Sequence, residues 1–306
     1  MRLATVALIG MLCTTAAADE PLPPEEQALA STEPGQVKPD NLHWDLELLY
    51  FHSQWQEGLD LSRARLAENP DDADLYWHVA RFLFEMGEQV DRNDTTVDKV
   101  DLYRQMIEVS EAGLERFPDH AHLQFAVGIG KGRLGTTRGV LKSLSLLKDV
   151  EAAWSHAASS DYVYRSIDGG EQLPCDAQLT LGIFYRLVPD SWIVKVLAGT
   201  RGDLQRSQRS LEAANACSPG DIGILKELGV THLCIADRED DAVHLGLGRQ
   251  FLEQSLRQPA RGDSTDMVDH QHIGMLLEDP SLACGYSRDG QQETDAKALR
   301  RLEDAQ

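Results

Sequence analysis

The sequence predicts an all-α fold, built as a solenoid of stacked helical hairpins. Apolar residues recur with helical spacing almost throughout the chain after Asn41, while the β-branched runs typical of strands are scarce. Short breaks, each with a proline followed by an acidic residue, recur between the helical segments. With 306 residues, of which 42% are apolar, the chain is long enough to bury a substantial core.

The chain begins with the pattern of a secretory signal peptide over residues 1–18. Arg2 supplies a positive charge, residues 3–12 form a short apolar core, and three alanines at 16–18 suit cleavage. Cys13 raises the alternative of lipid attachment, although a large residue precedes it. We therefore expect a periplasmic or secreted protein, with lipidation left open.

Residues 19–40 predict an extended, acidic, proline-rich linker. This stretch holds five prolines and shows no sustained apolar periodicity, so it has little apolar surface to offset the entropy of ordering it. A strap lying on the folded body is the alternative.

Three breaks share one pattern and divide the chain that follows. Pro70, Pro118 and Pro219 each come just after a helical segment, and an acidic residue that suits a helix start follows each of them. One β-branched stretch, residues 192–196, is short and isolated, and we expect a loop or short helix there. The helical segments expected from periodicity and breaks are 46–53, 59–66, 73–87, 103–116, 121–135, 203–217 and 222–236.

A large residue followed by a small one recurs at a fixed distance after these prolines. The pairs are Val79-Ala80, Val127-Gly128 and Leu228-Gly229, and Leu181-Gly182 is a fourth without a proline. A small residue at this position lets two helices approach closely. Tetratricopeptide repeats have a period of about 34 residues and end near proline. The sequence therefore predicts about four or five degenerate tetratricopeptide-like hairpins over 41–260, followed by a C-terminal helical tail over 261–306.

Four segments in a fixed order carry a family resemblance. They are residues 164–170 (YRSIDGG), 181–189 (LGIFYRLVP), 202–204 (GDL) and 211–219 (LEAANACSP). Together they resemble the tetratricopeptide-like T-components of bacterial TRAP transporters, and their order is also similar to the regulator of microtubule dynamics family. The resemblance covers roughly 45–258. It implies a helical solenoid that binds partners and has no catalytic residues.

Charge and hydropathy exclude several classes of partner. The 50 acidic residues against 29 basic ones give a net charge of −21, which opposes binding to nucleic acid or to anionic lipid because both need basic patches. The sequence holds no uninterrupted apolar run of about 18 residues, so it predicts no membrane span. We expect a protein partner, with a basic segment favoured by the charge, and we keep a small hydrophobic solute as the alternative ligand.

Four cysteines follow the predicted signal peptide: Cys175, Cys217, Cys234 and Cys284. Export permits disulfides, and four cysteines allow three pairings. Cys175 and Cys284 both lie in segments that look loop-like, which favours a Cys175–Cys284 bond. The alternative is that all four are reduced, with Cys234 a small core residue.

The sequence predicts no enzyme, metal or cofactor. We find no sequence motif typical of a serine hydrolase, a zinc protease or a phosphate-binding loop. Asp266 and His270 share one helical face and His272 lies nearby, so a metal-dependent hydrolase is kept as a second alternative. Two ligands do not make a site, however, and a solvated helix face explains these residues as well.

Aromatic residues mark a candidate partner groove. Tyr76, Trp77 and Phe84 fall in one predicted helix and Tyr185 in another. Most of these rings should be core, and any left exposed would offer an apolar anchor. The function predicted from the sequence is an exported, non-catalytic helical-repeat scaffold or accessory protein. The alternative is a periplasmic solute-binding accessory of a transporter.

Overall fold

The computed structural model describes residues 43–90, 98–166, 169–260 and 264–295. The predicted signal peptide, with Cys13, and the predicted linker lie outside these residues. The elements in chain order are α2 (Trp44–Phe51), α3 (Trp55–Glu68), α4 (Ala73–Gln89), α5 (Lys99–Arg116), α6 (Ala121–Arg138), the 3-10 helix η1 (Val140–Leu146), α7 (Leu147–Ser159), β1 (Tyr164–Arg165), β2 (Gln172–Leu173), α8 (Cys175–Leu187), α9 (Trp192–Ala198), α10 (Leu204–Cys217), α11 (Ile222–Glu239), α12 (Ala242–Leu256), α13 (Ser264–Glu278) and the 3-10 helix η2 (Pro280–Gly285).

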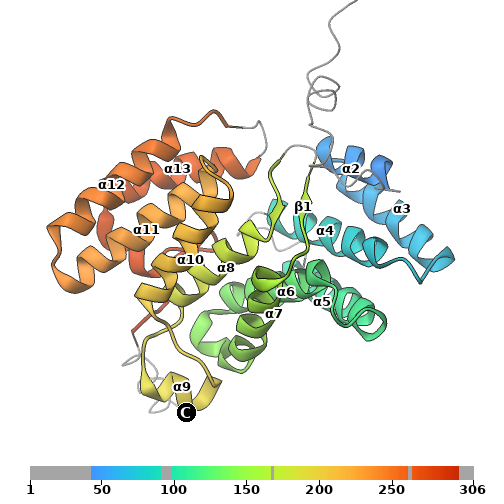
Figure 1. Cartoon of the computed structure of the whole chain (residues 1–306), viewed down its shortest axis with the longest axis horizontal. Coiled ribbons are helices and arrows are strands. Elements are labelled where there is room, and N and C mark those ends of the chain that lie inside the picture. Colours follow the sequence, from blue (N-terminus) through green and yellow to red (C-terminus); the bar gives the residue numbers. More distant parts are fainter. Residues whose placement is uncertain (1–42, 91–97, 167–168, 261–263, 296–306) are drawn as a thin grey trace, which may run out of the picture.

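The helices form a row of hairpins, which confirms the predicted all-α solenoid of tetratricopeptide-like units (Figure 1). The pairs are α2/α3, α4/α5, α6/α7, α8/α10 and α11/α12, and each pair also contacts the next one along the chain. The first helices of successive hairpins, α4, α6, α8 and α11, form what we call the inner face. Helix α13 packs against α11 and α12 and so continues the array.

The three predicted breaks lie between helices, as expected. Each helix after a break begins with a side chain that accepts a hydrogen bond from a backbone N–H: Asp72 before α4, His120 before α6 and Asp221 before α11. These caps satisfy donors that the first turn of a helix leaves without an intrahelical partner. The helices run slightly longer than predicted, since α5 begins at Lys99.

The small residues after the breaks are places where helices touch, as predicted. A Cβ placed on Gly128 would lie 2.4 Å from Trp154 Nε1, and one on Gly182 would lie 2.4 Å from Leu211 Cγ. Both partners belong to the second helix of the same hairpin. Because a real Cβ does not approach this closely, glycine is required for the observed packing.

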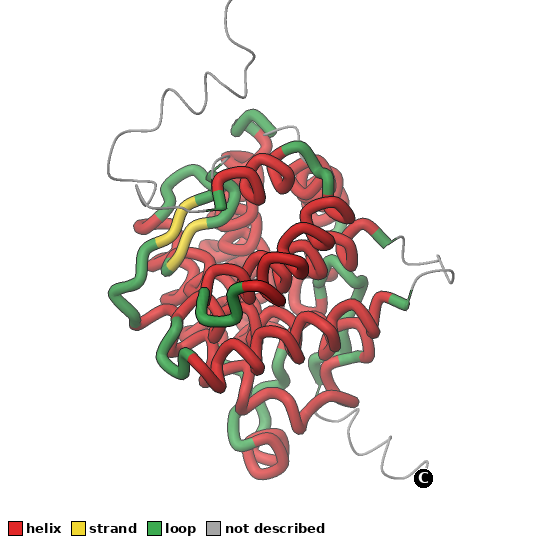
Figure 2. The backbone as a smooth tube through the Cα atoms, turned by 90° about the vertical axis from the view of Figure 1, so that its right-hand side faces the viewer, coloured by secondary structure: helices red, strands yellow, loops and turns green. Residues whose placement is uncertain are grey.

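Two non-helical segments and one short helix matter for the sites of this protein. Between α7 and α8, Tyr164 pairs with Leu173 and Arg165 with Gln172 in a two-residue antiparallel ladder (Figure 2). The stretch 192–196 is the start of the short helix α9, as the sequence suggested. After η2, residues 286–295 are not helical, so the described end of the predicted helical tail differs from expectation. Within the described residues, no helix is long and apolar enough to cross a membrane.

Candidate ligand-binding site

A mainly apolar cavity of about 220 Å³ lies against the inner face. Its apolar wall includes Ile129 of α6, Trp154 of α7, and Ile183 and Leu187 of α8. Trp154 reaches this place because Gly128 and Gly132 leave room on α6 for its indole ring. We call this space the apolar cavity. An apolar wall with few polar groups is typical of sites that hold small molecules.

A second cavity of about 210 Å³ adjoins the first and is richer in carboxylates. The two share the lining residues Phe84, Ile129, Leu179, Thr180, Gly223 and Arg288. The second cavity is also lined by Glu85, Asp266 and Asp269, and we call it the acidic cavity. Taken together, the two spaces fall within the range of roughly 300–1,000 Å³ found for small-molecule sites.

Glu85 is the carboxylate whose environment most favours the neutral form. Its side chain is buried on α4, and the Tyr50 hydroxyl donates a hydrogen bond of 2.7 Å to its Oε1. Burial raises the pKa of Glu85 to about 7, although the Tyr50 hydrogen bond acts in the opposite direction. The acidic cavity therefore holds a carboxyl group that changes charge near neutral pH.

A buried ion-pair network closes the N-terminal side of the acidic cavity. Arg81 Nη1 lies 2.9 Å from Glu47 Oε2, and Arg81 Nε lies 3.4 Å from Glu171 Oε2. The Tyr164 hydroxyl donates to Glu47 Oε1 at 2.8 Å. Burial opposes ionisation of Glu47, but the Arg81 charge outweighs it and lowers the pKa of Glu47 to about 2. The network joins α2, α4 and the β-hairpin through the Arg81 guanidinium and two carboxylates.

A second buried cluster lies at the C-terminal side. Asp269 of α13 accepts from Lys226 Nζ at 2.6 Å and from Arg288 Nη2 at 2.9 Å. Burial opposes ionisation of Asp269, but Arg288 and Lys226 outweigh it, so the pKa of Asp269 lies below its usual value. Arg288 lines both cavities, so this cluster forms part of the wall between them.

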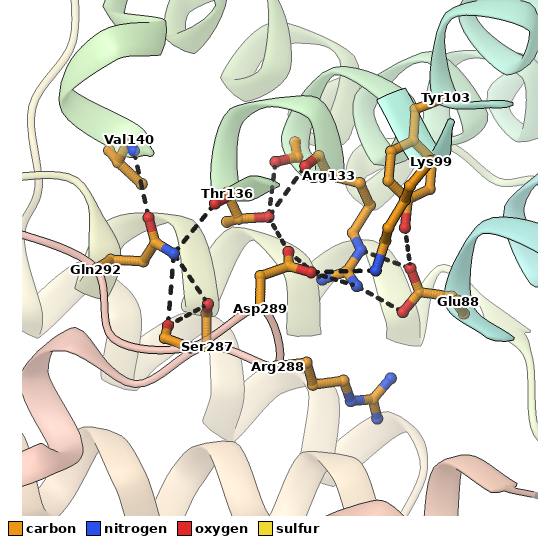
Figure 3. Close-up of polar contacts among 12 residues, drawn as sticks. Glu88, Lys99, Tyr103, Arg133, Thr136, Val140, Ser287, Arg288, Asp289 and Gln292 are labelled. Carbon is orange, nitrogen blue, oxygen red and sulfur yellow. Dashed lines mark hydrogen bonds and ion pairs between the residues drawn. The ribbon is translucent and has the colours of Figure 1, made fainter. Parts of the chain in front are cut away.

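Residues 287–292 form a strap that ties this cluster to the other half of the molecule (Figure 3). The Asp289 carboxylate lies 3.1 Å from Arg133 Nη1 and 3.3 Å from Lys99 Nζ, and it accepts from Thr136 Oγ1 at 2.6 Å. Gln292 Oε1 accepts from the Val140 backbone N–H at 3.3 Å. Arg288 points away from these contacts (Figure 3), and its Nη2 donates to Asp269 at 2.9 Å. The strap thus joins α13 to α5, α6 and η1.

The predicted partner groove is not one surface. Phe84 lines both cavities and Trp77 lines the acidic one. Tyr76 instead packs edge-on against Phe117. Tyr185 packs edge-on against Phe184, and its hydroxyl donates a hydrogen bond of 2.6 Å to Glu151. Tyr76, Trp77 and Tyr185 are all buried. The sequence therefore found two cavity residues and two core residues, because helical spacing alone does not tell which side of a hairpin faces inward.

The residues of the metal alternative do not form a common ligand set. Asp266 is buried beside the acidic cavity, whereas His272 Nδ1 lies 2.9 Å from the Tyr286 hydroxyl. Within the described residues, no three His, Cys, Asp or Glu side chains converge as a metal-ion site. Residues 91–97, which include Asp91 and Asp94, lie outside the described part of the chain.

The favoured Cys175–Cys284 disulfide is wrong. The structure pairs Cys175 with Cys217 and Cys234 with Cys284, with Cα–Cα distances of 5.5 and 4.6 Å. Helices α8 and α10 are antiparallel partners, so the first residue of one lies beside the last residue of the other. The 3-10 helix η2 packs on α11 and brings Cys284 to Cys234. The antiparallel geometry of a helical hairpin was the signal that could have predicted the Cys175–Cys217 disulfide.

Comparison with known proteins adds little to this description. No protein-family model and no curated protein matches the sequence. A solved structure titled "MamA RS-1 ArsTM double mutant" is similar, with a TM-score of 0.40 and 16% sequence identity. The match covers 70% of this chain and 93% of that chain. The helical hairpins of this chain are defined by its own helix–helix contacts.

Proposed function

We propose that this protein is a non-catalytic binding protein that holds a compact, mainly apolar ligand against the inner face. The observation that carries the proposal is the apolar cavity, which is walled by Ile129, Trp154 and Ile183 and shares the lining residue Thr180 with the acidic cavity. The apolar body of the ligand occupies the first cavity, and a polar end reaches toward the second. Contacts of this kind bury apolar surface and orient the ligand with few polar groups.

The strap favours a compact ligand over an extended peptide. Ser287 and Arg288 both line the apolar cavity, so the chain's own C-terminal segment already borders the inner face. A peptide laid along that face would have to pass the strap and its ion pairs. Binding of a protein partner, basic or otherwise, is our second proposal, and such a partner would bind a surface other than the inner face.

Two features support an exported location for this activity. The first is the signal-like sequence over residues 1–18. The second is the pair of disulfides, Cys175–Cys217 and Cys234–Cys284, because such bonds persist mainly in oxidising compartments. The resemblance to TRAP T-components is in keeping with a solute-binding accessory of a transporter, and we include that role in the proposal.

The test uses N-phenyl-1-naphthylamine, a neutral apolar fluorophore, with the full chain and two variants. Thr180→Trp places an indole at the junction of the cavities. Gln178→Trp is the matched control, since it adds the same ring two residues away on the opposite, outer side of α8. We expect saturable binding by the parent chain and by Gln178→Trp, and a loss of at least about tenfold in affinity for Thr180→Trp, as filling the site removes its contacts.

Equal binding by both variants would show that the probe sits elsewhere and would overturn the proposal. The same would follow if the parent chain failed to bind the probe after extraction of any co-purifying small molecule. Circular dichroism of both variants checks that the added ring has not unfolded the hairpin.

A further inference from the structure

Helix α9 presents an exposed apolar surface at one end of the molecule. Trp192, Val196 and Leu197 are 68%, 71% and 56% exposed, whereas Val194 and Ala198 on the other side of the helix are buried. Figure 1 shows α9 beyond the row of hairpins, joining α8 to α10. Apolar side chains scattered singly are ordinary, but three large ones on a seven-residue helix form a protruding surface. We call these three residues the α9 tip.

The fold holds this tip in a defined position. Ser191 Oγ accepts from the Ile193 backbone N–H, and the helix ends at Gly199 with a φ of +75°. The chain then returns tightly, because a Cβ on Gly202 would lie 1.8 Å from the Val188 carbonyl oxygen. The buried Val194 and Ala198 belong to the core cluster that includes Trp154. The exposed side chains of the α9 tip therefore belong to an ordered segment that is anchored in the core by Val194 and Ala198.

Lysines gather near the tip in a chain whose net charge is −21, and the nearby Asp190 is paired with Arg201 at 3.3 Å. Lys195 is exposed on α9, Lys148 packs against Gly199, and Lys142 lies on η1, which contacts α9. Within the described residues, these three lysines have no carboxylate within ion-pair distance, in contrast to Lys131, which pairs with Glu111 at 2.9 Å. The α9 tip thus combines exposed apolar side chains with nearby lysines that make no ion pair among the described residues.

We propose that the α9 tip docks the protein on an anionic lipid surface. Trp192 would lie at the headgroup level, where amphipathic rings are favoured, and Val196 and Leu197 would enter the edge of the acyl region. The lysines would meet lipid phosphates, an attraction that the acidic remainder of the chain does not supply. A convex apolar tip with unpaired lysines complements a soft, negatively charged surface. This is peripheral docking, and it requires no spanning helix.

The test is flotation of the full chain with vesicles of phosphatidylcholine alone or mixed with phosphatidylglycerol. Val196→Glu is compared with Val243→Glu, since Val243 on α12 is 69% exposed and offers the same substitution far from the tip. Lys195→Glu is compared in the same way with Arg249→Glu, another exposed cation on α12. All four variants share residues 1–42 with the parent chain, so vesicle binding by that segment would be equal among them.

We expect flotation only with the anionic vesicles, and weaker flotation as salt is raised. Val196→Glu should abolish it, Lys195→Glu should lower the partition coefficient by about tenfold, and both α12 variants should bind like the parent chain. Equal binding by Val196→Glu and Val243→Glu would overturn the proposal, as would equal binding to both lipid mixtures. The proposal would also be overturned if Val196→Glu left vesicle binding unchanged and altered only the particle mass measured by light scattering. The tip would then be a contact between two copies of this chain.

Discussion

Asp289 and Arg133 lie 3.1 Å apart at their charged atoms, although most of the hairpin array separates them along the chain. Asp289 belongs to the strap after η2, and Arg133 lies on the inner helix α6. Arg288, the residue before Asp289, contacts Asp269 on α13. Two adjacent strap residues thus join α13 to the middle of the array, a long-range closure that is unusual for a solenoid whose repeats contact only their neighbours.

Replacing Asp289 with Asn should release the strap. Burial opposes ionisation of Asp289, but Arg133, the Thr136 hydrogen bond and Lys99 outweigh it and lower its pKa. The ionised form therefore adds stability above the ordinary pKa of 3.8, and this is lost as the pH falls through the lower folded value. We expect Asp289→Asn to reduce the free energy of unfolding by about 2 kcal/mol at neutral pH.

Hydrogen exchange gives the sharper measurement for this variant. Backbone amides of residues 287–292 should exchange faster in Asp289→Asn, while those of α11 should change little, because the released segment opens locally. Asp149→Asn is the control, since that carboxylate is 61% exposed and pairs only with Lys131 among the contacts seen. Unchanged exchange over the strap would show that this ion pair does not hold it.

Two glycine substitutions should change stability in opposite directions. Gly182→Ala would place a Cβ 2.4 Å from Leu211 and force α8 and α10 apart, which we expect to cost about 1–3 kcal/mol. Gly246→Ala, on α12, meets nothing within 4 Å and should stabilise the helix by up to about 1 kcal/mol. Urea unfolding of both variants measures the difference. Equal effects would show that the hairpin tolerates a side chain at Gly182.

The two disulfides should be recovered by non-reducing peptide mapping as Cys175–Cys217 and Cys234–Cys284. Each closes a loop with a sequence separation of 42 or 50 residues, so removing either one by paired Ser substitutions should cost about 2–4 kcal/mol. Thermal unfolding with and without reductant measures this cost. A linked peptide containing Cys175 and Cys284 would contradict the assignment.

Glu85 should make the fold less stable as the pH rises toward neutral. Its folded pKa of about 7 lies above the ordinary value of 4.5, so the folded chain keeps a proton that the unfolded chain has released. The stabilisation from this proton is complete below about pH 4.5 and is lost as the pH rises through about 7, a change of about 3 kcal/mol.

Glu85→Gln should remove that part of the pH dependence, because an amide does not titrate. Denaturant unfolding between pH 4.5 and pH 8 compares it with Glu239→Gln, which changes an exposed carboxyl at the end of α11. If the two variants lost stability equally over this range, Glu85 would not be the titrating group.

Local patterns were sufficient for the three breaks and for the helices on either side of them, but they gave no bounds for α7, α8 or α12. Proline and a following acidic residue mark the turns at Pro70, Pro118 and Pro219, and the caps that satisfy helix N-termini are encoded within a few residues of them. Gly128 and Gly182 were predicted as contact points from spacing alone, since the position of a small residue in a repeat depends on its own helix and the next.

What the sequence by itself determined about this protein is therefore the all-α class, the turns at the three breaks and the contacts of Gly128 and Gly182 between paired helices. Only the tertiary structure decided the cysteine pairing, the cavity walls, the strap and the α9 tip. Cys284 meets Cys234, and Asp289 meets Arg133, because the last segment folds back over earlier hairpins. Such contacts depend on the summed rotation of all the repeats between them, which no local window of sequence contains.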